Sequence, residues 1–440
     1  MIKSNIRSLS GVLFITLIFL VFVVTTVCAE NRNPTPIDKY QTKLLGVAGR
    51  NTYGNGIAID SAGNCYITGF TDGNLDGQMK KGGFWNSYIV KYDANYNKQW
   101  TKLLQNDNCA EDIAIDSVGN CYITGYTYDN LDGQIKTGYI DAFIVKYDAN
   151  GNKQWTKLIG VAASNTYGNG IAIDSAGNCY ITGYTEGNLD GQIKIGERDT
   201  FTAKYDANGN QQWTKLIEAT QTTTIGYGIA IDNADNCYIV GDANGDFNGQ
   251  IKTGYIDAFI VKYDANGNQQ WTKLIGADEK STHGGDIVID SVGNCYIVGD
   301  TEGDLNGQTK IGFRDAFIVK YDANGNQQWT KLIGATQSTT YGQGIAIDIG
   351  GNSYITGFTD GNLDGQTKTG KTDAFIVKYD ANENQQWTKL LGVAASNTYG
   401  NGIAIDSADK WYITGWTNGN LDEQIKTGIW DAFIISKVNP

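Results

Sequence analysis

One tetrapeptide recurs along almost the entire chain at a nearly constant interval. Ile-Ala-Ile-Asp, replaced once by Ile-Val-Ile-Asp, occurs seven times in 440 residues, with one interval of 56 residues and five intervals of 58. A period of this size is typical of repeat architectures, in which each unit buries its apolar surface against its neighbours. We therefore expect seven copies of one structural unit. The tetrapeptides begin at Ile57, Ile113, Ile171, Ile229, Ile287, Ile345 and Ile403.

Each unit predicts four short strands, as the third unit illustrates. We expect strands over 170–174, 179–185, 201–205 and 211–217, where β-branched and aromatic residues prevail. The turns within the first and last pairs are Asp-Ser-Ala-Gly-Asn and Asp-Ala-Asn-Gly-Asn, in which glycine supplies a positive φ. A longer loop over 186–200 joins the two middle strands, and no stretch of the unit shows a helical period.

The two ends of the chain indicate how the array closes. The last unit stops after its third strand, 432–436, whereas residues 40–46 ahead of the first unit match the fourth strand at 99–104. The N-terminal strand should therefore complete the last unit. The sequence thus predicts an all-β fold over residues 39–440, a seven-bladed β-propeller of four-stranded antiparallel blades.

Three segments recur with little change from unit to unit. In the third and fourth units they are 170–183 (Gly-Ile-Ala-Ile-Asp-Ser-Ala-Gly-Asn-Cys-Tyr-Ile-Thr-Gly), 257–262 (Asp-Ala-Phe-Ile-Val-Lys) and 266–271 (Asn-Gly-Asn-Gln-Gln-Trp). In these segments the chain resembles the bacterial beta-propeller repeat family, also called SBBP repeats, over nearly all of residues 39–440. The resemblance implies a propeller fold in a secreted or surface protein, and it brings no catalytic motif.

The N-terminus has the features of an export signal. Lys3 and Arg7 precede an apolar stretch, which ends in a Val-Cys-Ala sequence that fits a signal-peptidase site. We interpret residues 1–29 as a signal peptide and 30–38 as a linker, so the propeller is expected outside the cytoplasm, extracellular or periplasmic. Two alternatives stay open: a lipid anchor on Cys28, and an apolar segment that is retained as a membrane anchor.

Charge and composition exclude several functions. The formal net charge of −13 disfavours binding to nucleic acid and polybasic docking to a membrane. His283 is the only histidine, which excludes metal sites built from several histidines. The glycine-rich segments follow the turns and contain no P-loop.

Three recurring side chains are interpreted as structural. Tryptophan in the fourth strand should pack between blades. Cysteine in the second strand should be a small buried hydrophobe, because equivalent positions on neighbouring blades are too far apart for a disulfide. Aspartate before the third strand should accept backbone N–H bonds, with a metal-binding ring of carboxylates as the alternative. The positions are Trp100, Trp155, Trp213, Trp271, Trp329 and Trp387; Cys65, Cys121, Cys179, Cys237 and Cys295; and Asp141, Asp199, Asp257, Asp315, Asp373 and Asp431.

Two of the long loops match the opening of a calcium-binding loop. Their Asp-x-Asn-x-Asp-Gly spacing supplies oxygen ligands, but the glutamate expected at position 12 is replaced by Gly83 and Lys371. We expect at most weak calcium binding and no other cofactor; the alternative is that these residues form turns within the loop. The candidate ligands are Asp72, Asn74, Asp76, Asp360, Asn362 and Asp364.

The candidate ligand site lies on the face that carries the longer connections between strands. One position ahead of each first strand is often tyrosine and should lie at the mouth of the central channel, where its ring is suited to stack on a sugar. Two tryptophans from loops of the first and last blades should lie nearby; the alternative is that the tyrosines only plug the channel. The candidate residues are Tyr53, Tyr167, His283, Tyr341, Tyr399, Trp85 and Trp430.

The sequence favours a non-enzymatic binding or scaffold protein, secreted or on the cell surface, that presents a multivalent face to a glycan or protein ligand. Nearly identical blades suit repeated weak sites, whereas catalysis normally needs one asymmetric group of residues. One alternative is a propeller hydrolase or lyase that depends on His283. Another is a purely structural component of a surface layer or an adhesion system.

Overall fold

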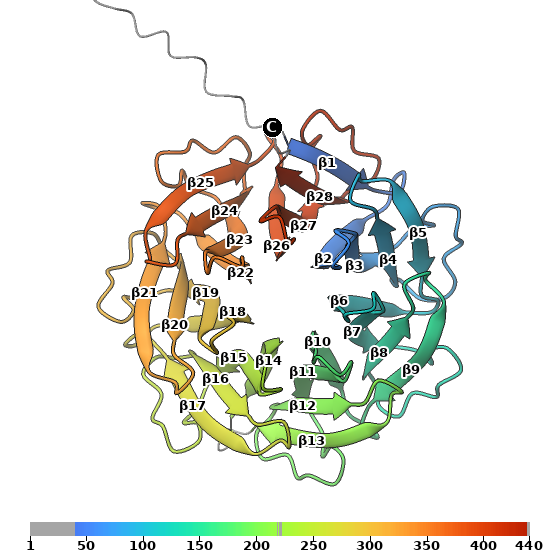
Figure 1. Ribbon diagram of the computed structural model, residues 1–440, viewed down its shortest axis with the longest axis horizontal. Helices are drawn as coiled ribbons and strands as arrows, with labels where there is room; N and C mark the ends of the chain where they lie inside the picture. Colours follow the sequence, from blue (N-terminus) through green and yellow to red (C-terminus); the bar gives the residue numbers. More distant parts are fainter. Residues whose placement is uncertain (1–39, 218, 220–221, 438–440) are drawn as a thin grey trace, which may run out of the picture. The chain divides into compact units, whose positions relative to one another are not determined.

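The computed structural model describes residues 40–217, 219 and 222–437, which form seven four-stranded antiparallel sheets arranged as blades around a central channel (Figure 1). In each blade one strand lies next to the channel and the fourth lies at the outer edge. The described residues contain no helix, and therefore none that is long and apolar enough to cross a membrane. The predicted seven-bladed propeller is confirmed. The predicted signal peptide, the linker and Cys28 lie outside the described residues.

The strands follow the repeat. Blade 1 contains β2 (Thr52–Ile59), β3 (Cys65–Thr71), β4 (Asn86–Tyr92) and β5 (Lys98–Leu103). Blade 2 contains β6 (Asn108–Ile115), β7 (Cys121–Thr127), β8 (Asp141–Tyr147) and β9 (Lys153–Ile159). Blade 3 contains β10 (Thr166–Ile173), β11 (Cys179–Thr185), β12 (Asp199–Tyr205) and β13 (Gln211–Ile217). Blade 4 contains β14 (Thr224–Ile231), β15 (Cys237–Ala243), β16 (Asp257–Tyr263) and β17 (Gln269–Ile275). Blade 5 contains β18 (Thr282–Ile289), β19 (Cys295–Thr301), β20 (Asp315–Tyr321) and β21 (Gln327–Ile333). Blade 6 contains β22 (Thr340–Ile347), β23 (Ser353–Thr359), β24 (Asp373–Tyr379) and β25 (Gln385–Leu391). Blade 7 contains β26 (Thr398–Ile405), β27 (Trp411–Thr417), β28 (Asp431–Lys437) and β1 (Tyr40–Leu45).

The N-terminal strand closes the ring, as the matching ends of the chain predicted. β1 is the outer strand of blade 7 and pairs antiparallel with β28. In this register Gln41 lies opposite Ser436, and Leu45 lies opposite Ala432. Blade 7 is therefore assembled from both ends of the described chain, and no hairpin turn connects β1 to β28.

The innermost strands are longer than the sequence indicated. In blade 3 the strand begins at Thr166, four residues before the predicted start, because the Gly-Asn-Gly segment continues the pairing through a β-bulge between Gly168 and Gly170. The same shift of register occurs in the inner strand of every blade. The extra residue of each bulge lines the channel; these residues are Asn55, Glu111, Asn169, Tyr227, Gly285, Gln343 and Asn401.

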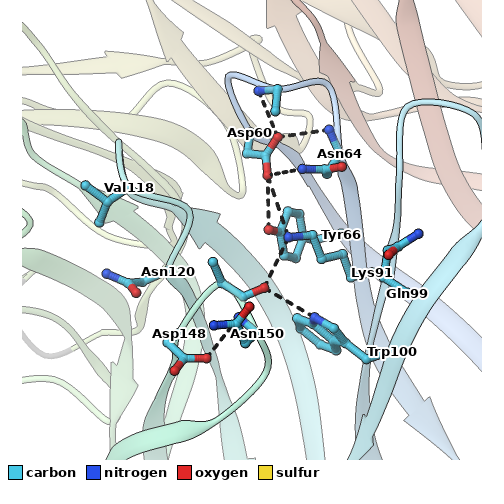
Figure 2. A network of polar contacts seen from close by, with 12 residues as sticks. Asp60, Asn64, Tyr66, Lys91, Gln99, Trp100, Val118, Asn120, Asp148 and Asn150 are labelled. Atoms are coloured by element: carbon cyan, nitrogen blue, oxygen red, sulfur yellow. Dashed lines mark hydrogen bonds and ion pairs between the residues drawn. The ribbon is translucent and has the colours of Figure 1, made fainter.

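The hydrophobic core lies between neighbouring blades. One cluster joins Tyr66 of blade 1 to Phe143 of blade 2, and Trp100 packs against it. The Trp100 ring contacts the Tyr66 ring at a centroid distance of 5.9 Å, and Nε1 of Trp100 donates to the carbonyl of Ala149 in blade 2 (3.4 Å). Figure 2 shows this network, in which Lys91 also donates to Ala149 (3.1 Å). The interpretation of the recurring tryptophans as packing between blades is confirmed.

The other two recurring side chains also have the expected structural roles. The six cysteines among the described residues are free and buried. The carboxylate of Asp141 accepts backbone N–H bonds from Thr137 (2.7 Å) and Gly138 (2.8 Å), and its equivalents in blades 3 to 7 do the same. Gly160 leaves room for this carboxylate, because a Cβ atom there would lie 2.0 Å from Asp141 Oδ1. Each aspartate thus fixes the end of its own loop.

The long loop between the second and third strands of a blade returns to the outer strand of that blade. In blade 3, Gln192 accepts a bond from the backbone N–H of Leu216 (3.1 Å) and donates to the carbonyl of Thr214. Asp190 accepts a bond from the hydroxyl of Thr214 (2.6 Å). The loop therefore occupies hydrogen-bonding groups on the exposed edge of β13, which would otherwise be open to pairing with another chain.

Candidate functional site

The mouth of the channel is built on one face by the starts of the inner strands and by the residues that precede the third strands. Backbone bonds tie these segments across blades: the N–H of Thr52 in blade 1 donates to the carbonyl of Trp430 in blade 7 (2.9 Å), and Thr166 in blade 3 donates to Ile140 in blade 2 (2.9 Å). Side chains at the mouth are therefore carried by backbone that is fixed to two blades. Such rigid support suits a binding site.

Blades 6, 7 and 1 together present one continuous group of aromatic side chains, here called the aromatic arc. The ring of Tyr399 lies 4.9 Å from Phe358 and 5.4 Å from Trp416, and Tyr53 lies 5.3 Å from Trp416, measured between centroids. These rings are partly exposed, so their faces are only partly covered by one another. The arc consists of Tyr341, Phe358, Tyr399, Trp416, Trp430, Tyr53, Phe70 and Trp85.

Five of the seven residues predicted for the ligand site belong to this arc: Tyr53, Tyr341, Tyr399, Trp85 and Trp430. The structure places the two tryptophans on neighbouring blades, as ring closure required. The remaining aromatic residues of the arc, Phe70, Phe358 and Trp416, were not predicted. They occupy one position of the second strand, directly opposite the predicted tyrosines in the register, so a pairing of the two strands would have revealed them.

Tyr167 lies in a separate aromatic group on blades 2 and 3. Its ring stacks on Tyr184 at 4.8 Å and meets Tyr126 edge-on at 4.8 Å. The guanidinium of Arg198 lies over the Tyr184 ring at 5.1 Å and pairs with Glu186 at 3.1 Å. Tyr167 therefore does not join the aromatic arc.

The predicted residue His283 lies among charged side chains on blades 4 and 5, here called the ionic sector. His283 Nδ1 lies 2.7 Å from Oδ2 of Asp242, whose other oxygen accepts the backbone N–H of Gly284 (2.9 Å). Arg314 pairs with Asp300 at 2.5 Å and also with Glu302. The ionic sector consists of Asp242, His283, Asp300, Glu302 and Arg314.

Burial shifts the acid–base behaviour of the ionic sector. The carboxylate of Asp242, which accepts a hydrogen bond from Nδ1 of the imidazolium, raises the pKa of His283 because it stabilises the charged form. Burial raises the pKa of Asp300 to about 6, although the charge of Arg314 opposes this shift. Most acidic positions of the repeat recur in several blades, so the sequence alone did not indicate an asymmetric acidic group. Asp242 and Asp300 are the exceptions, because the other five blades have an aromatic residue at this position.

Below the mouth, the bulged inner strands line a channel cavity of about 430 Å³. The predicted tyrosines are not among the residues that line this cavity. Asp112 and Asp286 stand where the other five blades have glycine, and each connects two blades. Asp112 accepts the backbone N–H of Ile171 (2.9 Å), and Asp286 accepts that of Ile345 (3.1 Å).

The candidate calcium ligands of blade 1 are engaged within their own blade. Asp72 accepts bonds from the backbone N–H (2.8 Å) and the side chain (2.9 Å) of Asn51. The side-chain oxygen of Asn74 accepts the backbone N–H of Lys80 (2.9 Å), and Asp76 accepts a bond from Thr101 on the outer strand. The three side chains therefore bond to three different segments of the blade.

The loop of blade 6 repeats this arrangement. Asp360 accepts the backbone N–H of Thr339 (2.7 Å), Asn362 accepts that of Lys368 (3.0 Å), and Asp364 bonds to Thr388 of the outer strand. Within the described ranges, no group of three or more acidic, histidine or cysteine side chains is arranged to hold a metal ion. Calcium binding stays a prediction, and titration calorimetry at millimolar calcium will check it.

Fold and sequence together define the class of this protein, a seven-bladed β-propeller built from tandem repeats. The model of the beta-propeller repeat family (SBBP) matches six segments of the chain, so the chain belongs to this family. The matched segments are 42–76, 154–190, 212–248, 270–306, 328–364 and 386–422.

Two curated proteins are similar in sequence. The regulatory protein FlaEY of Caulobacter vibrioides is 25% identical over 354 residues, which cover 69% of this chain and 35% of that protein. The uncharacterized WD repeat-containing protein L264 of Acanthamoeba polyphaga mimivirus is 31% identical over 221 residues, which cover 42% of this chain and 15% of that protein. The chain thus spans about a third or less of the length of these relatives.

Solved structures share the architecture. A virginiamycin B lyase from Staphylococcus aureus superposes with a TM-score of 0.50 at 10% identity, covering 91% of this chain and 100% of that chain. The polysaccharide lyase Uly1 superposes with a TM-score of 0.50 at 12% identity, covering 87% of this chain and 89% of that chain. At such low identity these likenesses show the fold alone.

Proposed function

We propose that this chain is a secreted, non-enzymatic binding protein whose channel mouth holds a glycan. The observation that carries the proposal is the aromatic arc, a group of partly exposed rings on rigidly supported backbone. Aromatic faces stack on the C–H faces of sugars, and tyrosine hydroxyls bond to sugar hydroxyls. The ionic sector adjoins the arc, because the guanidinium of Arg314 lies 5.2 Å from the centre of the Tyr341 ring. It supplies further donors and acceptors from His283, Asp300 and Arg314, the combination expected of a polar ligand site.

The proposed site combines the aromatic arc with the ionic sector. Four of the seven mouth positions carry tyrosine and the other three are Cys109, Ile225 and His283, so we propose one asymmetric site in place of the seven equivalent sites that the repeat suggested. A sugar stacked on the aromatic arc in blades 7 and 1 would extend across the mouth toward blades 4 and 5. A ligand long enough to reach both would be an oligosaccharide.

A glycan array probed with the full chain, with and without calcium, tests the proposal. At least one oligosaccharide should bind, and the combined change Tyr53→Ala and Tyr399→Ala should weaken that binding about tenfold or more, because two stacking faces are lost. Tyr139→Ala is the matched control, because Tyr139 is 66% exposed on a loop of blade 2 and lies outside the arc. Normal binding by the double variant would place the site elsewhere. If the array stays blank, a protein ligand or a purely structural role is favoured.

The pair of His283 and Asp242 favours a second candidate function, a propeller hydrolase or lyase. A carboxylate 2.7 Å from one ring nitrogen orients the imidazole and leaves the other nitrogen available for proton transfer, as in general acid–base catalysis. Incubation of bound oligosaccharides with the full chain should then release new chain ends, and His283→Gln should abolish this release while binding persists. No release by the wild-type chain would rule out this alternative.

A further inference from the structure

The junction between the last blade and the first carries side chains unlike those of the internal junctions. We propose that the edge of β28 and the adjacent turn of blade 1 form a strand-acceptor site that is selective for β1 and excludes the outer strands of the internal units. This inference is independent of the proposed function. It concerns which strand can complete blade 7 in a chain whose other outer strands are nearly identical.

An internal junction shows what the usual partners are. Trp155 on the outer strand of blade 2 lies opposite Lys146 in the register, and its indole lies against Gly209 in the turn of blade 3. A Cβ atom at Gly209 would lie 3.1 Å from Cδ2 of Trp155, so a side chain there would crowd the indole. The exception among the internal turns is Glu383 of blade 6, which pairs with Lys331 of blade 5 (3.6 Å). Lys146 covers the ring of Tyr122 at 4.8 Å and donates to Ala207 in the turn of blade 3 (3.0 Å).

At the closing junction the tryptophan, the lysine and the glycine are exchanged together. Gln41 replaces the tryptophan, Ser436 replaces the lysine opposite it, and Tyr96 stands in the turn where most other blades have glycine. Tyr96 is only 4% exposed, and its hydroxyl contacts the Ser436 hydroxyl. Its ring stacks on Tyr412 at 6.1 Å, and Lys410, where the other blades have asparagine, places its ammonium 4.9 Å from both rings.

Blade 7 carries Trp411, Trp416 and Trp430, which are large enough to fill the space left by the tryptophan that β1 lacks. The structure assigns that space to Tyr96 of blade 1, whereas Trp416 and Trp430 lie in the aromatic arc at the mouth. Trp411 instead contacts Tyr40 of β1 at 5.9 Å. The large residue has thus moved from the strand to the turn.

The exchange makes the two kinds of junction mutually exclusive. A tryptophan in place of Gln41 would approach the buried ring of Tyr96, and a buried overlap of this kind is destabilising. A tyrosine in place of Gly209 would meet Trp155 in the same way. The internal outer strands share the Thr-Lys-Leu segment with β1 and carry tryptophan at the position of Gln41. The side chain at this position is therefore what distinguishes β1 from a competing strand.

Selectivity at this site has a direct consequence for assembly. No hairpin turn connects β1 to β28, so an outer strand from a second copy could compete for the same edge. The ring of Tyr96 would clash with a tryptophan at the position of Gln41, and this clash disfavours pairing with the wrong strand. The closing junction should thus keep each chain closed on its own N-terminal strand.

A complementation experiment on the full chain tests this selectivity. Gln41→Trp should lower the melting temperature by about 3 °C or more and produce dimers or larger species in size-exclusion chromatography with light scattering. Tyr96→Gly should also lower the melting temperature, because it leaves a cavity. The combination of both changes rebuilds the tryptophan–glycine pair of the internal junctions, and it should recover at least half of the loss and restore the monomer.

The matched control applies the reverse exchange to an internal junction. Trp155→Gln combined with Gly209→Tyr should be less destabilising than the two single changes added together, because the larger residue again lies in the turn. The proposal is overturned if the effects of Gln41→Trp and Tyr96→Gly are simply additive. It is equally overturned if Gln41→Trp leaves both the melting temperature and the monomeric state unchanged.

Discussion

At the scale of single residues, the channel wall differs from blade to blade at one position next to the bulge. Aspartate at residues 112 and 286 replaces the glycine of the other five blades, and glutamate at residue 111 precedes the first of them. Burial raises the pKa of Glu111 and of Asp112 to about 7, and that of Asp286 to about 6. These carboxyl groups connect the blades, so their protonation is linked to the stability of the fold.

The sign of this linkage follows from the direction of the shifts. Carboxyl groups in the unfolded chain have a pKa of about 4. Between about pH 4 and 7 the folded state therefore binds more protons than the unfolded state. The free energy of unfolding should therefore fall as the pH rises through this range. We expect the melting temperature of the wild-type chain to decrease more steeply from pH 5 to pH 8 than that of Asp112→Gly combined with Asp286→Gly. Parallel curves from differential scanning fluorimetry would contradict this prediction.

At the scale of elements, the long loop between the second and third strands of a blade holds the outer strand, in blade 3 as in blades 1 and 6, whose loops were predicted as calcium sites. Asp190→Ala removes the bond to the Thr214 hydroxyl and should cost about 1 kcal/mol of stability. The freed loop should be cut faster in limited proteolysis, with new cleavage within residues 186–198. Glu197→Ala changes an exposed side chain of the same loop and serves as the control. Equal cleavage rates in the two variants would show that the bond to β13 does not hold the loop.

Strand positions could be predicted because the information for them is local. The Asp-Ala-Asn-Gly-Asn turns and the constant period mark the start and end of most strands. The bulges could not be predicted, because Gly-Asn-Gly at 168–170 has the composition of a turn and becomes a strand only by pairing with β11. The course of the long loops was missed for a related reason. Asp76 and Gln192 bond to an outer strand more than twenty residues away, and spacing within the loop does not reveal that partner.

The candidate site could be predicted in part. Five of the seven predicted residues lie in the aromatic arc because they occupy equivalent positions of adjacent blades. Of the ionic sector, only His283 was predicted. Asp242 and Asp300 replace the aromatic residue that the other five blades have at this position, and their ion pairs form only when blades 4 and 5 pack together. Which ligand the mouth binds is not encoded in any recurring motif.

At the scale of the whole molecule, closure by β1 determines whether the seven blades form one cooperative unit. Deleting residues 40–46 should expose the edge of β28 and the core of blade 7, where Leu45 is 5% exposed. We expect a lower melting temperature and concentration-dependent association, measured by circular dichroism and light scattering. An unchanged melting temperature would mean that the ring does not depend on its closing strand.

The split construction of blade 7 also bears on how the gene can change. Residues 135–160 and 251–276 differ at a single position, so unequal recombination between units can delete or duplicate 58-residue segments in the middle of the coding sequence. Such an event leaves β1 and the strands β26 to β28, which together form the closing blade, in place on either side of the rearranged units. The number of internal units can therefore vary, while every resulting chain still contains both β1 and β28 and can close the ring. The same shuffling would exchange mouth side chains between blades, so a new combination of them could arise in one step without altering the junction that completes the ring.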